Sequence, residues 1–146
     1  MATLDVSIDV DKPIDEAWKV FMDESKMPEW LTGFQSMELI EGEPQTVGSK
    51  HRMVFEERGK EMIFIETVNA IEPPNEFSFT LDHESMASDM KMTLESIGED
   101  KTRISSHTDM QAKTLMWKIM MLFMKGSMRK RQNQQFEKLK GLIESS

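Results

Sequence analysis

The first ten residues alternate between polar and apolar side chains, which puts the apolar residues from Leu4 to Val10 on one face. This period of two is typical of a strand with one buried face, and it predicts a strand over 3–10. Pro13 ends the alternation and suits the first turn of a helix, where its missing N–H costs nothing. The spacing that follows predicts two short helices, the second over 27–31. The apolar residues of the first helix are Ala17, Trp18, Phe21 and Met22.

The central part of the chain, 34–111, consists of short segments of alternating or clustered apolar residues separated by turn residues. Pro44, Gly59, Pro73 and Gly98 stand at four of these breaks. No helical spacing intervenes between the segments. We therefore expect six strands with short connections, which is the pattern of a meandering antiparallel sheet.

The last part of the chain, 114–144, has the spacing of one long helix of about 45 Å. Its apolar stripe consists of Met121, Met128, Phe136, Leu139 and Ile143. The predicted order is thus a strand, two short helices, six strands and a long helix. At 146 residues the chain has a common size for one domain, so we expect a single α+β domain over 1–146.

Composition limits the kinds of site that the protein can have and the compartment in which we expect it. The chain has no cysteine, which excludes disulfides and thiolate sites and fits a cytoplasmic protein. The longest apolar run, 115–124, contains Lys118 and is shorter than the ~20 residues that span a bilayer. The N-terminus has no basic stretch followed by an apolar core, so we expect no signal peptide.

Charge is unevenly distributed along the chain. The formal net charge of −8 argues against general nucleic-acid binding. From residue 113 onward, however, eight Lys and Arg stand against two Glu, a balance of +6, so 1–112 carries −14. Two interpretations remain open. We favour a basic helix that lies across an acidic sheet, and the alternative is a basic face for an anionic lipid surface or a partner.

Several segments together with the order of elements resemble a known superfamily. They are Val10-Asp11-Lys12-Pro13-Ile14-Asp15-Glu16-Ala17-Trp18, Met27-Pro28-Glu29-Trp30, Glu72-Pro73-Pro74, Phe77-Ser78-Phe79 and Leu139-Lys140-Gly141-Leu142-Ile143-Glu144. The chain resembles the helix-grip (SRPBCC) superfamily of START lipid-transfer domains, pollen-allergen-type ligand binders and polyketide cyclase/dehydrase-like proteins. The resemblance implies a curved antiparallel sheet wrapped around the C-terminal helix, with a cavity between them for an apolar or amphipathic ligand. It leaves the function open, because the superfamily includes carriers, receptors, enzymes and protein-binding modules.

Few residues of the sequence indicate a catalytic or metal-binding role. The motifs of serine hydrolases, zinc proteases and phosphate-binding loops are absent, and we expect no catalytic motif, no metal and no cofactor. His83 stands near a probable hairpin turn, where solvation is a better interpretation than metal binding, and strand phase places His107 on the outer face. Glu66 shares its phase with Phe64, so it is either a buried carboxylate with a raised pKa or, after a small shift of phase, exposed to water. His51 is a weaker candidate for a group in the cavity.

The candidate ligand contacts are aromatic and methionine residues of the predicted inner face, two methionines of the final helix, and two polar groups that would orient a ligand. They are Trp30, Met53, Phe55, Phe64, Glu66, Phe77, Phe79, Met90, Met92, Ser106, Met120 and Met124. Ordinary core packing is the alternative for the apolar members of this set.

The final helix is apolar on every side between Leu115 and Met124 except at Lys118, whereas a surface helix needs only one apolar stripe. The excess would cover a ligand entrance, a membrane surface or a partner subunit, the last through a homodimer over 115–128. We expect the protein to bind or carry a lipid, a polyketide-like compound or an isoprenoid. Two alternatives stay open. One is a polyketide cyclase/dehydratase-like enzyme, which needs two convergent ionisable groups. The other is a protein-interaction module that uses the Met-rich helix, as in activators of heat-shock ATPases.

Overall fold

The computed structural model describes residues 2–146, which form seven strands, three α-helices and one 3-10 helix, η1. The elements are β1 (Ala2–Val10), α1 (Ile14–Phe21), η1 (Glu24–Lys26), α2 (Met27–Trp30), β2 (Phe34–Glu41), β3 (Lys50–Glu57), β4 (Lys60–Glu72), β5 (Glu76–Asp82), β6 (Met86–Gly98), β7 (Lys101–Ala112) and α3 (Leu115–Ser145). The predicted order is confirmed, with η1 as an addition before α2. Helix α2 ends one residue earlier than predicted, because the backbone of Leu31 is extended.

Side chains next to the helices explain where they begin. Pro13 precedes α1, and the acidic residues Asp15 and Glu16 occupy its first turn, where they favour the positive end of the helix dipole. At the other end of the chain, the hydroxyl of Thr114 accepts a hydrogen bond from the backbone N–H of Trp117 at 3.3 Å and caps α3. This cap sets the start of the long helix two residues after β7.

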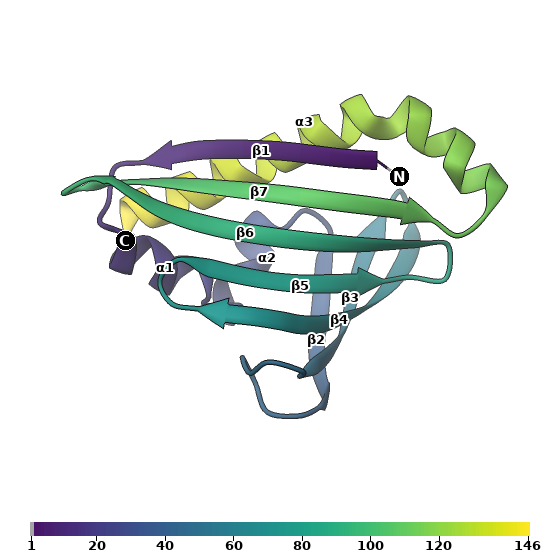
Figure 1. The fold of residues 1–146 in the computed structure, drawn as a ribbon, viewed down its shortest axis with the longest axis horizontal. Helices are drawn as coiled ribbons and strands as arrows, with labels where there is room; N and C mark the ends of the chain where they lie inside the picture. Colours follow the sequence, from purple (N-terminus) through teal and green to yellow (C-terminus); the bar gives the residue numbers. More distant parts are fainter. Residues whose placement is uncertain (1) are drawn as a thin grey trace.

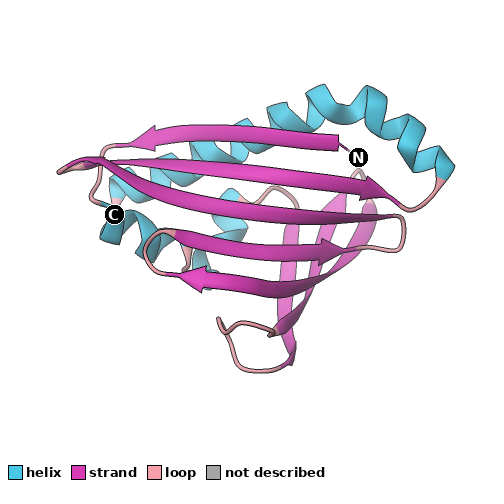
Figure 2. Cartoon of the chain, viewed as in Figure 1, coloured by secondary structure: helices cyan, strands magenta, loops and turns pink. Residues whose placement is uncertain are grey.

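All seven strands form one antiparallel sheet in the order β1-β7-β6-β5-β4-β3-β2. The strands from β2 to β7 pair with their neighbours in the chain, and β1 pairs with β7, which is distant in sequence. Figures 1 and 2 show that the sheet curves strongly and that the helices lie on its concave side. The predicted helix-grip architecture, a curved antiparallel sheet around a long C-terminal helix, is therefore confirmed.

The pairing register decides which side chains face the helices. Val6 on β1 pairs with Ser106 on β7, and Ser106 pairs with Met92 on β6. Met92 pairs in turn with Phe77 on β5. All four side chains are buried, and since side chains alternate along a strand, the residues two positions away share this inner face.

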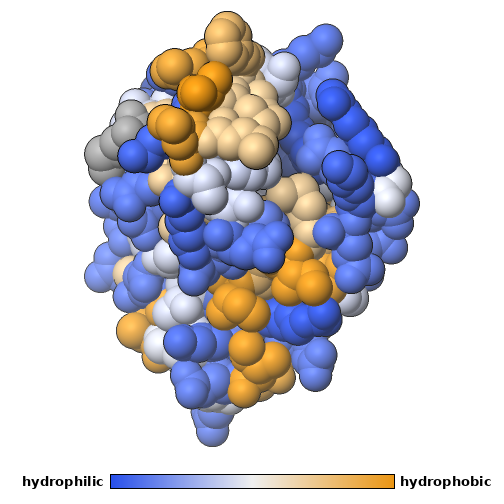
Figure 3. Space-filling view, turned by 90° about the vertical axis from the view of Figure 1, so that its right-hand side faces the viewer, coloured by the Kyte–Doolittle hydropathy of each residue, from blue (hydrophilic) through white to orange (hydrophobic). Residues whose placement is uncertain are grey.

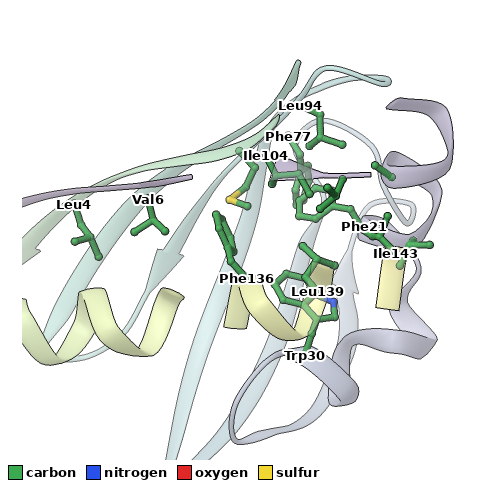
Figure 4. Close-up of a cluster of buried hydrophobic side chains, with 14 of the residues drawn as sticks. Leu4, Val6, Phe21, Trp30, Phe77, Leu94, Ile104, Phe136, Leu139 and Ile143 are labelled. Carbon is green, nitrogen blue, oxygen red and sulfur yellow. The ribbon is translucent and has the colours of Figure 1, made fainter. Parts of the chain in front are cut away.

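The main apolar core lies where α1, α2 and the second half of α3 meet the sheet (Figure 4). Phe136, Leu139 and Ile143 of α3 are at most 2% exposed. The ring of Phe21 on α1 lies 6.1 Å from that of Trp30, between centroids, and so joins α1 to α2. The predicted stripe of α3 is confirmed in this half of the helix.

The first half of α3 extends past this core. Helix α3 packs chiefly on β1, α1, α2 and β7 rather than across the whole sheet. Along its inner stripe Met121 is buried and Met128 is half-buried, whereas Leu122 and Phe123 are 80% and 82% exposed. Within residues 2–146, no helix has the combination of length and apolar character that crossing a membrane requires.

Candidate functional site

The strands bring the predicted contact residues together on the inner face. Met53 on β3 pairs with Phe64 on β4, and Phe79 on β5 pairs with Met90 on β6. Phe55 lies two residues from Met53 and shares its face. These strand candidates thus share one face of the sheet. Their roles as ligand contacts stay a prediction.

Two hydroxyl groups of β7 interrupt this apolar face. Ser106 and Thr108 are 3% and 5% exposed, and neither hydroxyl oxygen has a hydrogen-bond partner within residues 2–146. Thr102, further along the same face of β7, differs because its hydroxyl donates a hydrogen bond of 2.8 Å to the backbone oxygen of Lys12. A buried polar group without a partner destabilises a fold by about 1–3 kcal/mol, so the two unpartnered hydroxyls call for a functional explanation.

Two more unpartnered polar atoms come from the helices opposite the sheet. Trp30 Nε1 on α2 and Gln132 Oε1 on α3 are buried, and neither finds a partner in the described part of the chain. Gln132 stands one helical turn from both Met128 and Phe136, so it belongs to the stripe of α3 that faces the sheet. The layer between sheet and helices therefore holds polar atoms on both sides.

A histidine and a carboxylate meet on the inner face of β3 and β4. His51 and Glu66 are directly opposite in the register, and His51 Nδ1 lies 3.2 Å from Glu66 Oε1. Both side chains are almost fully buried. The contact is not aligned as a hydrogen bond, and within residues 2–146 neither ring nitrogen of His51 has a hydrogen-bond partner. The open question of where these two residues point is settled: both lie on the inner face.

Burial gives the carboxyl of Glu66 an unusual proton affinity. Loss of solvation raises the pKa of Glu66 to about 7, and a smaller contribution comes from repulsion by Glu24 of η1. Near neutral pH this carboxyl can therefore either hold a proton or release it. The ring nitrogens of His51 beside it can donate or accept a hydrogen bond. The pair thus combines an acid and a base in a site shielded from water.

A row of aromatic rings crosses from β2 to the start of α3. Phe34 and Phe55 lie 5.7 Å apart, Phe55 and Phe64 also 5.7 Å, Phe64 and His83 5.2 Å, and His83 and Trp117 6.5 Å, between ring centroids. We call these five residues the aromatic wall. All of them are half-buried, so the wall is a surface that is only partly covered by the rest of the chain.

The remaining candidates separate into packed and open positions. Phe77 and Met92 belong to the packed core, as does Trp30 apart from its Nε1 atom. Met124 is half-buried and Met120 is 39% exposed, on the part of α3 next to Trp117. Met120 and Met124 therefore lie within two turns of Trp117, the residue through which α3 meets the aromatic wall.

The surface of residues 2–146 has hollows on both sides of the sheet, and two of them are defined by their lining residues. One of about 380 Å³ lies between the β3–β4 hairpin and the middle of α3, and it is lined by Thr32, Glu56, Glu57, Arg58, Ser127 and Arg131. The other, of about 320 Å³, is lined by side chains of β1, β6 and β7 that include Asp5, Lys91 and His107. Neither is a closed cavity between the sheet and α3, so that cavity stays a prediction.

The other two histidines have different surroundings. His107 points outward and pairs with Asp5, as its strand phase predicts, and this contact raises the pKa of His107. His83 belongs to the aromatic wall, where the sequence predicts only a solvated residue near a turn. No group of three or more potential metal ligands is found in the part of the chain that the structure describes.

Besides Phe34 and His83 of the aromatic wall, sequence reasoning missed three members of this site. Thr108 follows Ser106 by two residues, so the alternation of β7 could have identified it. Gln132 lies on the apolar stripe of α3 at the spacing of one turn from Phe136, which is likewise a readable signal. Trp117 contacts His83 of the aromatic wall only because of where α3 lies, and no local sequence pattern predicts this contact.

Comparisons with known proteins agree with this architecture. The sequence model of the family described as "Polyketide cyclase / dehydrase and lipid transport" matches residues 1–144. None of the curated proteins matches the sequence significantly. A conserved protein from Geobacillus kaustophilus has a similar structure, with a TM-score of 0.81, 19% identity, and coverage of 97% of this chain and 95% of that one.

Two further solved structures are similar over nearly the whole chain. The Zhui aromatase/cyclase from a Streptomyces species has a TM-score of 0.80 and 11% identity, over 98% of this chain and 93% of that one. A START superfamily protein from Mycobacterium smegmatis has a TM-score of 0.78 and 15% identity, over 98% and 97%. At such identities these structures establish a shared fold.

Proposed function

The chain belongs to the polyketide cyclase/dehydrase and lipid transport family, and from this premise we propose that it binds an apolar or amphipathic small molecule between the inner face of the sheet and α3. The observation that carries the proposal is the pair of unpartnered hydroxyls, Ser106 and Thr108, on a face made mainly of apolar side chains. A ligand with one polar end would satisfy these hydroxyls while its apolar part contacts the surrounding side chains. Ligand sites commonly have this composition, mostly apolar with a few polar groups that fix orientation.

The aromatic wall indicates which ligands would fit. Ring faces such as those of Phe55 and Phe64 offer stacking contacts to a flat aromatic compound and a smooth apolar surface to an acyl chain. The flexible side chains of Met120 and Met124 on α3 can adapt to either shape. The family's description names polyketides and lipids, and one similar structure is an aromatase/cyclase. We therefore propose a lipid or a polyketide-like aromatic compound as the ligand class.

Native mass spectrometry of the freshly purified protein, followed by denaturing extraction, tests the proposal. An apolar compound that leaves the protein in near-stoichiometric amount would support it and identify the ligand class. Titration with a fluorescent fatty acid and with a naphthol then measures affinity for the two kinds of ligand. Both probes are expected to bind less tightly, by about tenfold, when the hydroxyl is removed in Ser106→Ala, since a hydrogen bond in a buried site contributes about 1 kcal/mol or more.

The adjacent residue provides the matched control. Ser105 points to the outer face of β7, so Ser105→Ala removes the same hydroxyl from the opposite side of the strand. It is expected to leave the affinity for both probes unchanged. Equal affinities for the two variants, or no binding of either probe together with an empty native spectrum, would contradict ligand binding at the inner face.

A second candidate function is catalysis, and the His51–Glu66 pair favours it. These are the two convergent ionisable groups that a cyclase/dehydratase-like enzyme requires. In a dehydration of a β-hydroxy carbonyl compound, a neutral His51 would take a proton from the carbon next to the carbonyl. The protonated carboxyl of Glu66 would give its proton to the departing hydroxyl, so that a carbon–carbon double bond forms and water leaves.

Isosteric substitutions separate catalysis from binding. If the pair is catalytic, His51→Gln and Glu66→Gln are each expected to lower the turnover of a bound ligand at least about a hundredfold, in the range typical of general acid–base groups. The affinity measured with the fluorescent probes should change far less. Turnover that is equal in the native protein and both variants would exclude the pair from catalysis.

A further inference from the structure

The first half of α3 presents a wholly apolar face to solvent. Six side chains make up this face, which we call the α3 ridge: Leu115 (73% exposed), Met116 (68%), Ile119 (51%), Met120 (39%), Leu122 (80%) and Phe123 (82%). In Figure 3 apolar side chains gather at the top of the molecule, over the start of α3. Exposed apolar groups of this size and continuity usually mark a surface that binds something.

Helix geometry explains why the ridge faces outward. Successive residues are about 100° apart around an α-helix, so Ile119 and Phe123 lie nearly opposite Met121. Met121 is the residue of this half that packs into the core, at 7% exposed. Most of the ridge therefore points away from the sheet, with Met120 at its edge, one turn from the half-buried Met124, and within residues 2–146 no contact covers the rest.

Basic residues border the ridge. Lys118 and Lys125 are seven residues apart and share one flank of the helix with Arg129, and Lys130 continues the line of Phe123 two turns further on. No acidic residue occurs between 113 and 136. The ridge is thus an apolar face with positive charge along one side and at one end.

These charges are largely uncompensated by the sheet. Within residues 2–146, Lys118, Lys125 and Lys130 form no ion pair, whereas Lys113 pairs with Asp82 of β5 at 2.6 Å and Arg131 with Glu57 of β3 at 2.7 Å. The favoured interpretation of the charge distribution, basic residues from 113 onward that complement an acidic sheet, therefore holds for Lys113 and Arg131. Arg129 donates a hydrogen bond of 2.8 Å to the backbone oxygen of Asp5, and Lys118, Lys125 and Lys130 are left to meet an external anionic surface.

From this combination we propose that the α3 ridge docks on an anionic lipid bilayer. A helix with Leu, Met and Phe on one face and Lys beside it matches the pattern of helices that lie in a membrane interface. Lysine is depleted in the centres of protein–protein interfaces, and in a symmetric dimer through this helix Lys118 and Lys125 of both copies would approach without acidic partners nearby. Negatively charged lipid headgroups, in contrast, attract all of them.

Sedimentation with lipid vesicles tests the proposal on the full chain. Binding is expected to vesicles of phosphatidylglycerol mixed with phosphatidylcholine, and much less to phosphatidylcholine alone. Replacing the two most exposed apolar residues, in Leu122→Gln/Phe123→Gln, should reduce partitioning at least about a hundredfold. Lys118→Gln/Lys125→Gln should reduce it by about 25-fold, because each charge near an anionic surface contributes roughly a factor of five.

Matched variants keep the test specific. Val47→Gln and Ile40→Gln change side chains that are 67% and 49% exposed in the β2–β3 region, away from α3, and are expected to leave vesicle binding unchanged. Phe123→Trp, with lipids brominated along their acyl chains, reports insertion directly, because bromine quenches a tryptophan that enters the apolar layer.

Three outcomes would overturn the proposal. The first is a monomer that binds neither kind of vesicle, which would leave a protein partner as the occupant of the ridge. The second is vesicle binding that persists in Leu122→Gln/Phe123→Gln. The third is a stable dimer, measured by size-exclusion chromatography with light scattering, that this double variant dissociates. In that case the ridge binds a second copy of the chain, the homodimer predicted through 115–128.

Discussion

His51 Nδ1 and Glu66 Oε1 lie 3.2 Å apart in directly opposite positions of β3 and β4. Fifteen residues and a hairpin separate the two in the chain, and the register of that hairpin makes them neighbours. Since both are buried, a proton placed between them is held by protein groups rather than by water. Stability should therefore depend on pH through Glu66, because burial raises the pKa of its carboxyl to about 7.

The first prediction concerns Glu66→Gln. The pKa of Glu66 is raised from 4.5 to about 7 in the folded protein, so between these pH values the unfolded chain releases a proton that the native state retains. The native protein should therefore lose stability relative to Glu66→Gln as pH rises through this range, by about 3 kcal/mol in total. Chemical denaturation of both proteins at a series of pH values measures the difference.

Glu61→Gln controls for the loss of one negative charge, because Glu61 is an exposed carboxylate on the same strand. A difference between the native protein and Glu66→Gln that stays constant from acid to neutral pH would show that burial does not perturb Glu66.

The second prediction compares two threonines on the same face of β7. Thr108→Val removes a hydroxyl that has no partner in the described chain and should raise the free energy of unfolding by about 1 kcal/mol. Thr102→Val removes a hydroxyl that donates to Lys12 and should lower it by about the same amount or more. Thermal and denaturant unfolding of both variants checks the signs. A loss of stability in Thr108→Val would mean that the hydroxyl has a partner in solution.

The third prediction concerns Arg131, which ties α3 to two other parts of the fold. Its guanidinium pairs with Glu57 at 2.7 Å and donates to the backbone oxygen of Thr32 at 3.0 Å. Arg131→Gln should lower stability by about 1 kcal/mol, because both contacts are partly shielded from water. The neighbouring Lys130→Gln, which removes a cation without an ion pair in residues 2–146, should have no measurable effect. Equal losses of stability in the two variants would show that the contacts of Arg131 with Glu57 and Thr32 do not stabilise the fold.

The fourth prediction concerns Gly126 inside α3. A Cβ added there would meet no atom within 4 Å, so Gly126→Ala should stabilise the helix by about 1 kcal/mol. Denaturant unfolding measures the gain. If the variant gains stability but binds the fluorescent probes more weakly, the missing side chain at Gly126 leaves room for the ligand. A loss of stability would mean that α3 needs the flexibility of glycine at this position.

Much of the architecture could be predicted from local pattern. The alternation along β1 and β7, the spacing of Phe136, Leu139 and Ile143, and the turn at Gly59 each depend on residues close together in the chain, and each prediction is confirmed. The outward position of His107 follows from the same alternation. The alternation alone leaves two positions open for Glu66, because a bulge of one residue turns its side chain outward. The pairing of β3 with β4 is regular at Glu66. The register shift of β4 lies further along, between Val68 and Ala70, in its pairing with β5.

The sequence by itself determined the order of elements, the inner face of each strand and the apolar excess in the first half of α3, because periodicity and composition are local properties. Only the tertiary structure decided that His51 meets Glu66, that Trp117 joins the aromatic wall and that the hydroxyls of Ser106 and Thr108 lack partners while that of Thr102 has one. These contacts depend on strand register and on where α3 crosses the sheet. Both are set by packing among residues far apart in the chain, which no local pattern encodes.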